Sequence, residues 1–193
     1  MGHLICAQEA HARLCLDSLL FMPIGAAPHR EIDQDPGREV RALLCERALE
    51  GDVRFAVSRV EVDRDGPSFT SDTLRLVSAA SPKDELVLIL GADQASALSS
   101  WHEPETVLSL ARVAVASRGD IEREAVTRGL HGLDGHEGVE FFDMPRVDVS
   151  SSLVRTRVAE GRPIRYLVPD GVAEEIESGA LYGAGAPART GGG

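Results

Sequence analysis

Short runs of apolar residues alternate with amphipathic stretches along most of the chain. The clearest apolar run is Leu86–Leu90, five aliphatic residues with no polar residue between them. A strand without polar alternation is typical of a parallel sheet that is covered on both faces. We therefore expect this run to be a buried central strand, ended by Gly91, with Asp93 just past its carboxyl end.

Other segments complete the pattern. Apolar runs predict strands at 18–24, 53–57, 113–116 and 139–142. Apolar residues at helical spacing predict helices at 4–14, 36–49, 70–80, 104–110, 120–130, 151–160 and 168–177. Asp35, Thr70 and Ser150 are suited to cap helices, and Gly51 and Gly161 are suited to end them.

This order of strands and helices predicts βαβ units. The expected fold is therefore α/β, with a Rossmann-like open, mostly parallel sheet and helices on both faces. The chain opens on a helix, so the first strand that such a domain normally has is missing from it. We expect residues 1–182 to form one domain and residues 183–193, mainly Gly, Ala and Pro, to form a disordered tail.

Composition narrows the range of partners. The net charge is −11, so we do not expect non-specific binding to nucleic acid. Cys6, Cys15 and Cys45 form no CxxC pair and no zinc-binding spacing, which suits reduced thiols and predicts no metal site built from the protein alone. The sequence has no apolar run of membrane-spanning length and no signal peptide, so we expect a cytoplasmic protein that does not enter a membrane.

Polar residues follow several predicted strands, at the edge where open parallel sheets bind ligands. In chain order these residues are His29, Arg30, Thr70, Asp93, Trp101 and Arg118. Each alone is a weak signal, because a solvated loop residue is the simpler explanation. Trp101 is the one tryptophan of the chain. Together these residues predict a ligand site on one rim of the sheet.

Three hydroxyls begin a later helix: Ser150, Ser151 and Ser152, with Arg155 one turn further on. Free backbone N–H groups and the positive end of a helix dipole suit a phosphate, and Arg155 can reach the same anion. An ordinary N-cap beside a surface arginine is the alternative. A serine nucleophile fits less well, because the chain has no Gly-x-Ser-x-Gly and carries Arg155 where a Ser-x-x-Lys pair needs lysine.

The start of the first predicted helix offers a second place for a phosphate. Gly2 and His3 lie there, and an imidazole at a helix N-terminus suits a polyphosphate and can steady charge during transfer. A solvated terminal histidine is the alternative interpretation.

These segments together resemble the bacterial nicotinate-nucleotide adenylyltransferases, of the nucleotidylyltransferase superfamily. The resemblance covers residues 2–182. It rests on Gly-Ala-Ala-Pro-His-Arg at 25–30, Gly-Pro-Ser-Phe-Thr at 66–70, Gly-Ala-Asp at 91–93, Trp-His-Glu-Pro at 101–104, Ser-Ser-Ser-Leu-Val-Arg at 150–155 and Ile-Arg-Tyr-Leu-Val-Pro at 164–169. It implies transfer of AMP from ATP to nicotinate mononucleotide in NAD biosynthesis, with Mg²⁺ accompanying ATP and pyrophosphate released.

The resemblance also implies roles for individual residues. Trp101 would stack on the pyridine ring, while Thr70 and the backbone near His102 would hold the nicotinate carboxylate. Asp93 would contact a ribose. The residues that would hold the rest of the mononucleotide are His29, Arg30 and Arg118. The residues that would bind ATP are Gly2, His3, Ser150, Ser151, Ser152 and Arg155, with His3 and Arg155 also catalytic.

One departure from the family concerns its signature loop, Gly-Gly-[Ser/Thr]-Phe-Asp-Pro-x-His-x-Gly-His, of which Met1, Gly2 and His3 match the last three positions. The strand before that loop would lie beside Leu86–Leu90, and without it two flanking strands should expose apolar edges. We expect the natural chain to begin upstream of Met1, which mass spectrometry of the native protein would test. Two alternatives stay open: a sibling adenylyltransferase acting on another phosphate substrate, and a nucleotide-binding protein made inactive by the missing loop.

Overall fold

The strand at the middle of the larger sheet is β4 (Arg112–Ser117). It pairs in parallel with β3 (Val87–Gly91) on one side and with β5 (Glu140–Asp143) on the other. A second, separate parallel pair is formed by β1 (Leu19–Phe21) and β2 (Phe55–Val57). The computed structural model describes residues 1–26, 35–117 and 119–184.

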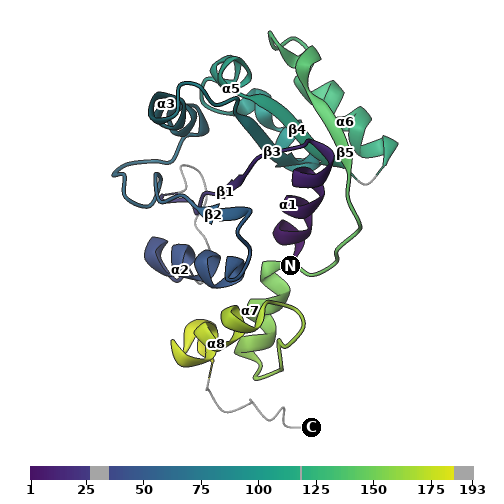
Figure 1. Cartoon of the computed structure of the whole chain (residues 1–193). Coiled ribbons are helices and arrows are strands. Elements are labelled where there is room, and N and C mark those ends of the chain that lie inside the picture. Colours follow the sequence, from purple (N-terminus) through teal and green to yellow (C-terminus); the bar gives the residue numbers. More distant parts are fainter. Residues whose placement is uncertain (27–34, 118, 185–193) are drawn as a thin grey trace.

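Helices connect these strands and surround the sheets (Figure 1). They are α1 (Gly2–Arg13), α2 (Arg38–Leu49), α3 (Thr70–Ala80), α4 (Ala92–Ser96), α5 (Pro104–Leu110), α6 (Asp120–Leu130), α7 (Ser151–Ala159) and α8 (Asp170–Ser178), with 3-10 helices η1 (Leu98–Ser100), η2 (His136–Gly138) and η3 (Leu181–Gly183). The expected alternation of strands and helices with parallel pairing is confirmed. Within the described ranges, no helix is long and apolar enough to cross a bilayer.

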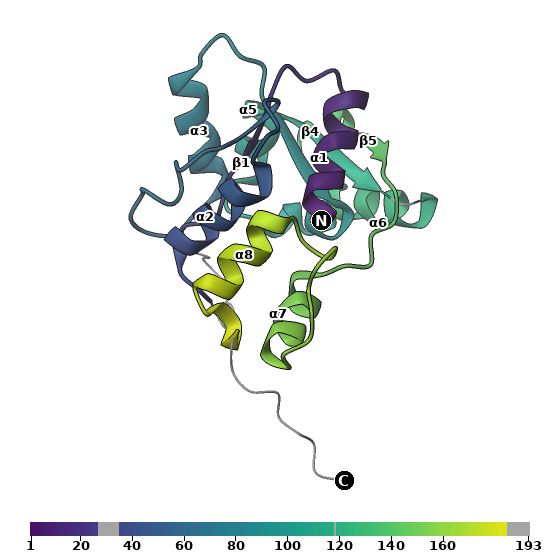
Figure 2. The same ribbon diagram turned by 60° about the horizontal axis from the view of Figure 1, so that its bottom comes forward.

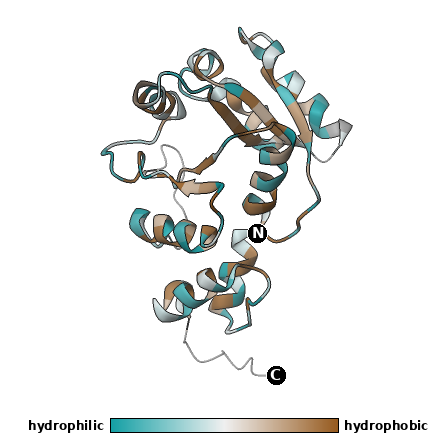
Figure 3. Cartoon of the chain, viewed as in Figure 1, coloured by the Kyte–Doolittle hydropathy of each residue, from teal (hydrophilic) through white to brown (hydrophobic). Residues whose placement is uncertain are grey.

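The side chains of β4 alternate between two hydrophobic cores. Val113 and Val115 pack into a cluster with buried residues of α3, α4, α5 and α6, while Ala114 and Ala116 pack into a cluster with Ala10 of α1. Figure 3 shows mostly apolar residues in the strands and a mixture of apolar and polar residues in the helices around them. Small residues at the second contact let α1 lie close to the sheet. Both faces of the larger sheet are therefore covered, as the sequence predicts.

The prediction that residues 86–90 form the fully buried central strand is wrong. Val87, Leu88 and Ile89 in β3 are only partly buried, whereas every β4 residue from Val113 to Ser117 is buried. The reason is that β3 pairs with a strand on one side only, among the residues that the structure describes. The same is true of β1. The expectation of unpaired strand edges at this place in the fold is thereby confirmed.

Two predicted caps differ from the structure. Helix α2 begins at Arg38, after Gly37 as the N-cap, and the Asp35 side chain instead accepts a hydrogen bond from the Gly37 N–H (3.0 Å). Gly37 has a φ of 93°, a conformation that favours glycine. Thr70 is the first residue of α3 rather than its cap, which is Phe69 without a capping side chain.

Two further stretches are helical where the sequence predicts no helix. Between the predicted strand at 86–90 and the predicted helix at 104–110, the structure adds α4 and η1, for which the sequence predicts no helix. Gly183, expected as the start of a disordered tail, ends η3, and Ala184 packs against the C-terminal core. The rest of the expected tail, 185–193, lies outside the described residues.

Helices α7 and α8 form a small third core together with α2. Val154, Val158 and Ile176 are buried there, and Leu44 and Ala48 of α2 pack against them. Figures 1 and 2 both place α7 and α8 together below the sheets, next to α2 and near the beginning of α1. This arrangement brings the start of α7 to the same side of the molecule as the start of α1.

Candidate active site

Two distant segments of the sequence meet at the beginning of α3. The ring of Phe69 lies 4.4 Å from the ring of His102, centroid to centroid, at an angle of 34°. Arg75 of α3 forms an ion pair with Glu103, with 2.5 Å between Nη2 and Oε2. Thr70 follows Phe69 directly, so it lies next to this contact, and its role in binding stays a prediction. Phe69 itself was not predicted as a contributor, although it belongs to the Gly-Pro-Ser-Phe-Thr segment.

Trp101 is held in place by the turn before it. Its backbone N–H donates to the carbonyl of Leu98 (3.0 Å), and the side chain of Leu98 is fully buried. The indole is partly buried and packs against the main core cluster. After His102 the chain turns sharply at Glu103, whose φ of 50° is unusual for a residue with a side chain, and Pro104 then starts α5. Packing against the main core therefore fixes Trp101, the residue just before His102.

Asp93 lies in the first turn of α4, directly after β3, as expected. Its side chain is exposed and accepts a hydrogen bond from Gln94 Nε2 at 3.4 Å. A Cβ at position 91 would lie 2.9 Å from Asp93 Oδ1. Glycine at 91 therefore leaves room for the carboxylate to lie over the end of the strand.

The predicted phosphate-binding residues lie together at the start of α7. Ser150 is confirmed as the N-cap, its Oγ accepting from the Leu153 N–H at 3.1 Å. Ser151 and Ser152 are exposed on the first turn, and Arg155 Nη2 donates to Ser152 Oγ at 3.3 Å. The arginine fork and the hydroxyls therefore lie at the positive end of one helix, where an anion is favoured.

Tyr182, which ends the stretch covered by the resemblance but has no predicted role, lies within range of the charge of Arg155. Burial raises the pKa of the Tyr182 hydroxyl, the positive charges of Arg155 and Arg41 oppose that rise, and the negative charge of Asp35 adds to it. Tyr182 has a φ of 55°, an unusual conformation for a residue with a side chain, and it packs against the core formed by α7 and α8. These interactions place Tyr182, Arg41 and Asp35 in the neighbourhood of the predicted phosphate-binding arginine.

The remaining predicted residues divide into two groups. Gly2 and His3 form the first turn of α1, where Gly2 is partly buried and His3 is exposed. His29, Arg30 and Arg118 lie outside the described residues, so their roles stay predictions.

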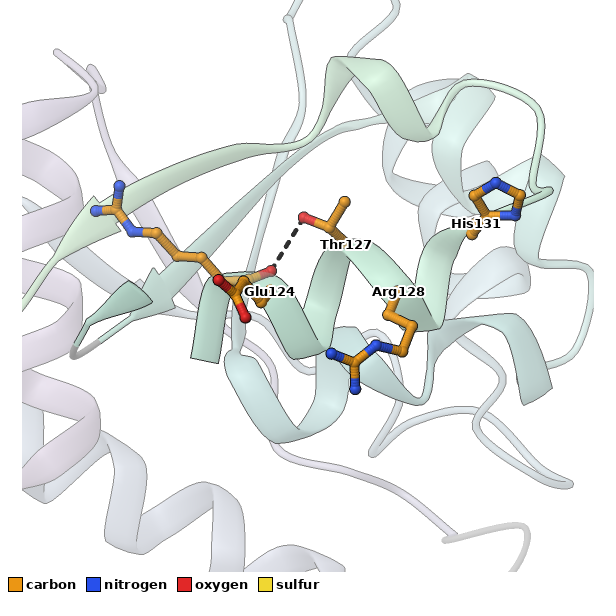
Figure 4. A pocket seen from close by; sticks show the side chains of 5 residues that line it. Glu124, Thr127, Arg128 and His131 are labelled. Carbon is orange, nitrogen blue, oxygen red and sulfur yellow. Dashed lines mark hydrogen bonds between the residues drawn. The ribbon is translucent and has the colours of Figure 1, made fainter. Parts of the chain in front are cut away.

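An open groove of about 650 Å³ runs along α6. It is lined by Arg123, Glu124, Thr127, Arg128 and His131 (Figure 4). Thr127 Oγ1 donates to the Arg123 carbonyl within the helix (3.0 Å), so that hydroxyl is already used. None of the predicted site residues that the structure describes lines this groove, and we place the candidate site at the starts of α3, α4 and α7 instead.

The sequence places the chain in a class of protein, the nucleotidyltransferases: residues 1–157 match the cytidylyltransferase-like family. The chain is 36% identical to the probable nicotinate-nucleotide adenylyltransferase of Tropheryma whipplei strain Twist, over 94% of this chain and 92% of that protein. It is 38% identical to the protein of that name from Paenarthrobacter aurescens, over 97% and 87%. The chain belongs to the nicotinate-nucleotide adenylyltransferases.

A solved structure agrees with the fold. The Plasmodium falciparum nicotinic acid mononucleotide adenylyltransferase complexed with NaAD superposes with a TM-score of 0.69. The match covers 94% of this chain and 89% of the other at 13% sequence identity. The resemblance inferred from the sequence motifs and the α/β fold class are therefore confirmed.

Proposed function

We propose that this protein transfers the adenylyl group of ATP to nicotinate mononucleotide, forming nicotinate adenine dinucleotide and pyrophosphate. The observation that supports this proposal is the contact of the Phe69 and His102 rings at the start of α3, in a member of this family. Phe69 is followed by Thr70, and His102 is preceded by Trp101. A flat ring with a carboxylate needs an aromatic face and N–H donors. The indole of Trp101 and the backbone N–H groups at the beginning of α3 are suited to those two needs.

ATP would bind at the start of α7. Ser151, Ser152 and the backbone N–H groups of the first turn would donate to phosphate oxygens, and Arg155 would pair with the same phosphates. His3 at the start of α1 would contribute a further donor, and Gly2 would let the backbone approach closely. Asp93 would accept a hydrogen bond from a ribose hydroxyl.

The reaction would be a direct in-line displacement. An oxygen of the mononucleotide phosphate attacks the α-phosphorus of ATP, the bond from that phosphorus to the bridging oxygen breaks, and pyrophosphate leaves with the electron pair. No covalent bond to the enzyme forms. The protein contributes position and charge neutralisation, and Arg155 and His3 are the groups that we assign to the developing negative charge.

Mg²⁺ would accompany ATP. Such an ion is held largely by phosphate oxygens and water, with one or two carboxylates at most. Among the described residues there is no group of three or more His, Cys, Asp and Glu side chains that could hold a metal. We therefore expect the ion to arrive with the nucleotide. When bound, the ion would offset negative charge on the triphosphate.

The test is replacement of Trp101 by alanine. Loss of a stacking partner costs ~1–3 kcal/mol, so the KM for nicotinate mononucleotide should rise ~10- to 100-fold while the KM for ATP changes little. Trp101→Phe keeps a ring and should lose less. Steady-state kinetics of pyrophosphate release would measure both constants. Equal losses for the two substrates would contradict the assignment, and preference of the wild type for nicotinamide mononucleotide in a competition assay would shift the substrate to the amide.

A further inference from the structure

Helix α3 contacts the segment that links η1 to α5 at two points. Phe69, the N-cap of α3, lies with its ring 4.4 Å from the ring of His102, centroid to centroid. Arg75 of the helix pairs with Glu103, with 2.5 Å between Nη2 and Oε2. The Nη1 of Arg75 also donates to Asp72 Oδ1 at 3.1 Å, which orients the guanidinium on its own helix. Two consecutive residues of the segment are therefore held by α3.

The backbone of that segment has a conformation that is costly by itself. Glu103 has a φ of 50° and a ψ of 61°, a region that residues with a side chain rarely adopt. Pro104 restricts the backbone of Glu103 further. The carbonyl of Glu103 nevertheless accepts the hydrogen bond from the Val107 N–H (3.2 Å) with which α5 begins. Other contacts must offset the cost of this turn, and the two contacts with α3 lie directly at it.

The other end of the segment is held by the main core. The Trp101 N–H donates to the carbonyl of Leu98 (3.0 Å), and the indole packs against the main core cluster. Trp101 is thus attached to the core, whereas His102 and Glu103 are attached to α3. The distance between Trp101 and the start of α3 consequently depends on the two contacts that α3 makes.

We propose that Phe69 and Arg75 are positioning residues for the pyridine end of the mononucleotide, because they set the distance between Trp101 and the N–H groups at the start of α3. This inference rests on the proposed function, which assigns the pyridine ring to Trp101 and its carboxylate to those N–H groups. Neither side chain needs to touch the substrate in this role. Phe69 acts through His102, and Arg75 acts through Glu103.

The first experiment compares Arg75→Ala with Arg47→Ala. The two arginines are matched, because they are 45% and 43% exposed and each pairs with one carboxylate on its own helix and one on another element. Exposed ion pairs are weak, so the KM for nicotinate mononucleotide should rise about 2- to 5-fold in Arg75→Ala. The KM for ATP should not change, and Arg47→Ala should leave both constants at their wild-type values. Glu103→Gln should match Arg75→Ala, and the double variant should be no worse than either single one.

The second experiment addresses the ring contact. Phe69→Ala removes an aromatic pair and should raise the KM for nicotinate mononucleotide about 3- to 10-fold, whereas Phe69→Tyr keeps the ring and should retain the wild-type value. Combining Phe69→Ala with Arg75→Ala should give the largest rise, because the binding arrangement is then populated least. Equal rises in the KM values for the two substrates, or a Phe69→Tyr variant as weak as Phe69→Ala, would overturn the inference.

The fluorescence of Trp101 gives a readout that needs neither substrate nor activity. Trp101 is the one tryptophan of the chain, so the emission reports on this segment alone. Quenching by acrylamide should increase in Phe69→Ala and in Arg75→Ala but not in Arg47→Ala, and unchanged quenching in the first two would overturn the inference. If the wild-type protein forms no dinucleotide, the proposed function fails, while increased quenching would still support the role of Phe69 and Arg75 in holding the segment.

Discussion

Replacing Val115 with alanine tests whether β4 is the centre of the fold. Val115 is fully buried in the main core, on the face of β4 turned toward α3, α4, α5 and α6. The change removes two methyl groups at ~0.8 kcal/mol each, and the cavity left in a rigid strand adds about 1 kcal/mol. The expected loss is therefore ~2–3 kcal/mol of unfolding free energy. For a chain of this length that corresponds to a fall in Tm of about 5–10 °C.

Thermal and urea unfolding of the ligand-free protein would measure the loss, with Val53→Ala as the matched control. Val53 is fully exposed, so the same chemical change there should alter stability by less than about 0.5 kcal/mol. A Val115→Ala variant as stable as Val53→Ala would refute the assignment of β4 as the buried middle strand. An unchanged urea m-value alongside a shifted midpoint would show that the effect lies in the folded state.

Two other predictions concern the surface charge and the helix packing. The side-chain hydrogen bond from Arg54 lowers the pKa of Asp52 from 3.8 to about 2, so the stability that this pair contributes is complete above pH 4 and is lost as the pH falls toward 2. In Asp52→Asn the midpoint of urea unfolding should therefore depend less on pH across that range. The same pH dependence in variant and wild type would count against the pair. A Cβ on Gly129 would lie 2.3 Å from the Ser96 carbonyl oxygen, so Gly129→Ala should force α6 away from α4 and cost ~1–3 kcal/mol in thermal unfolding. Gly138→Ala, with open space around it, should be nearly neutral, and similar Tm values for the two variants would disprove the close contact.

Much of the fold could be predicted because its helices carry clear local signals. The bounds of α3, α5 and α6 are those expected from apolar spacing, Pro104 and the flanking breakers. The error at residues 86–90 has a different origin. Five aliphatic residues indicate a strand suited to burial, but the number of strands that pair with it depends on the whole sheet. Helix α4 was missed because five residues are too few to show a helical period.

The sequence predicts those parts of the candidate site whose residues lie close together in one motif. The group at the start of α7 is of this kind, since the cap, the hydroxyls and Arg155 are close in sequence. The contact of Phe69 with His102 depends on how α3 packs on α5, which no local pattern encodes. Arg41 gave no signal at all, because its partners are mainly backbone carbonyls and any residue type can supply those.

Within the part of the chain that the structure describes, β1 and β3 each pair on one side only, which has a consequence for the protein in solution. Most proteins protect exposed strand edges with charged residues or proline. Here the two strands with an open edge, β1 and β3, are rich in aliphatic and aromatic residues. Mutual repulsion between molecules of net charge −11 is then a main barrier to intermolecular strand addition. Added salt screens that repulsion within about 10 Å at 0.1 M, so storage at low ionic strength should favour dispersed molecules over fibrous or amorphous precipitate.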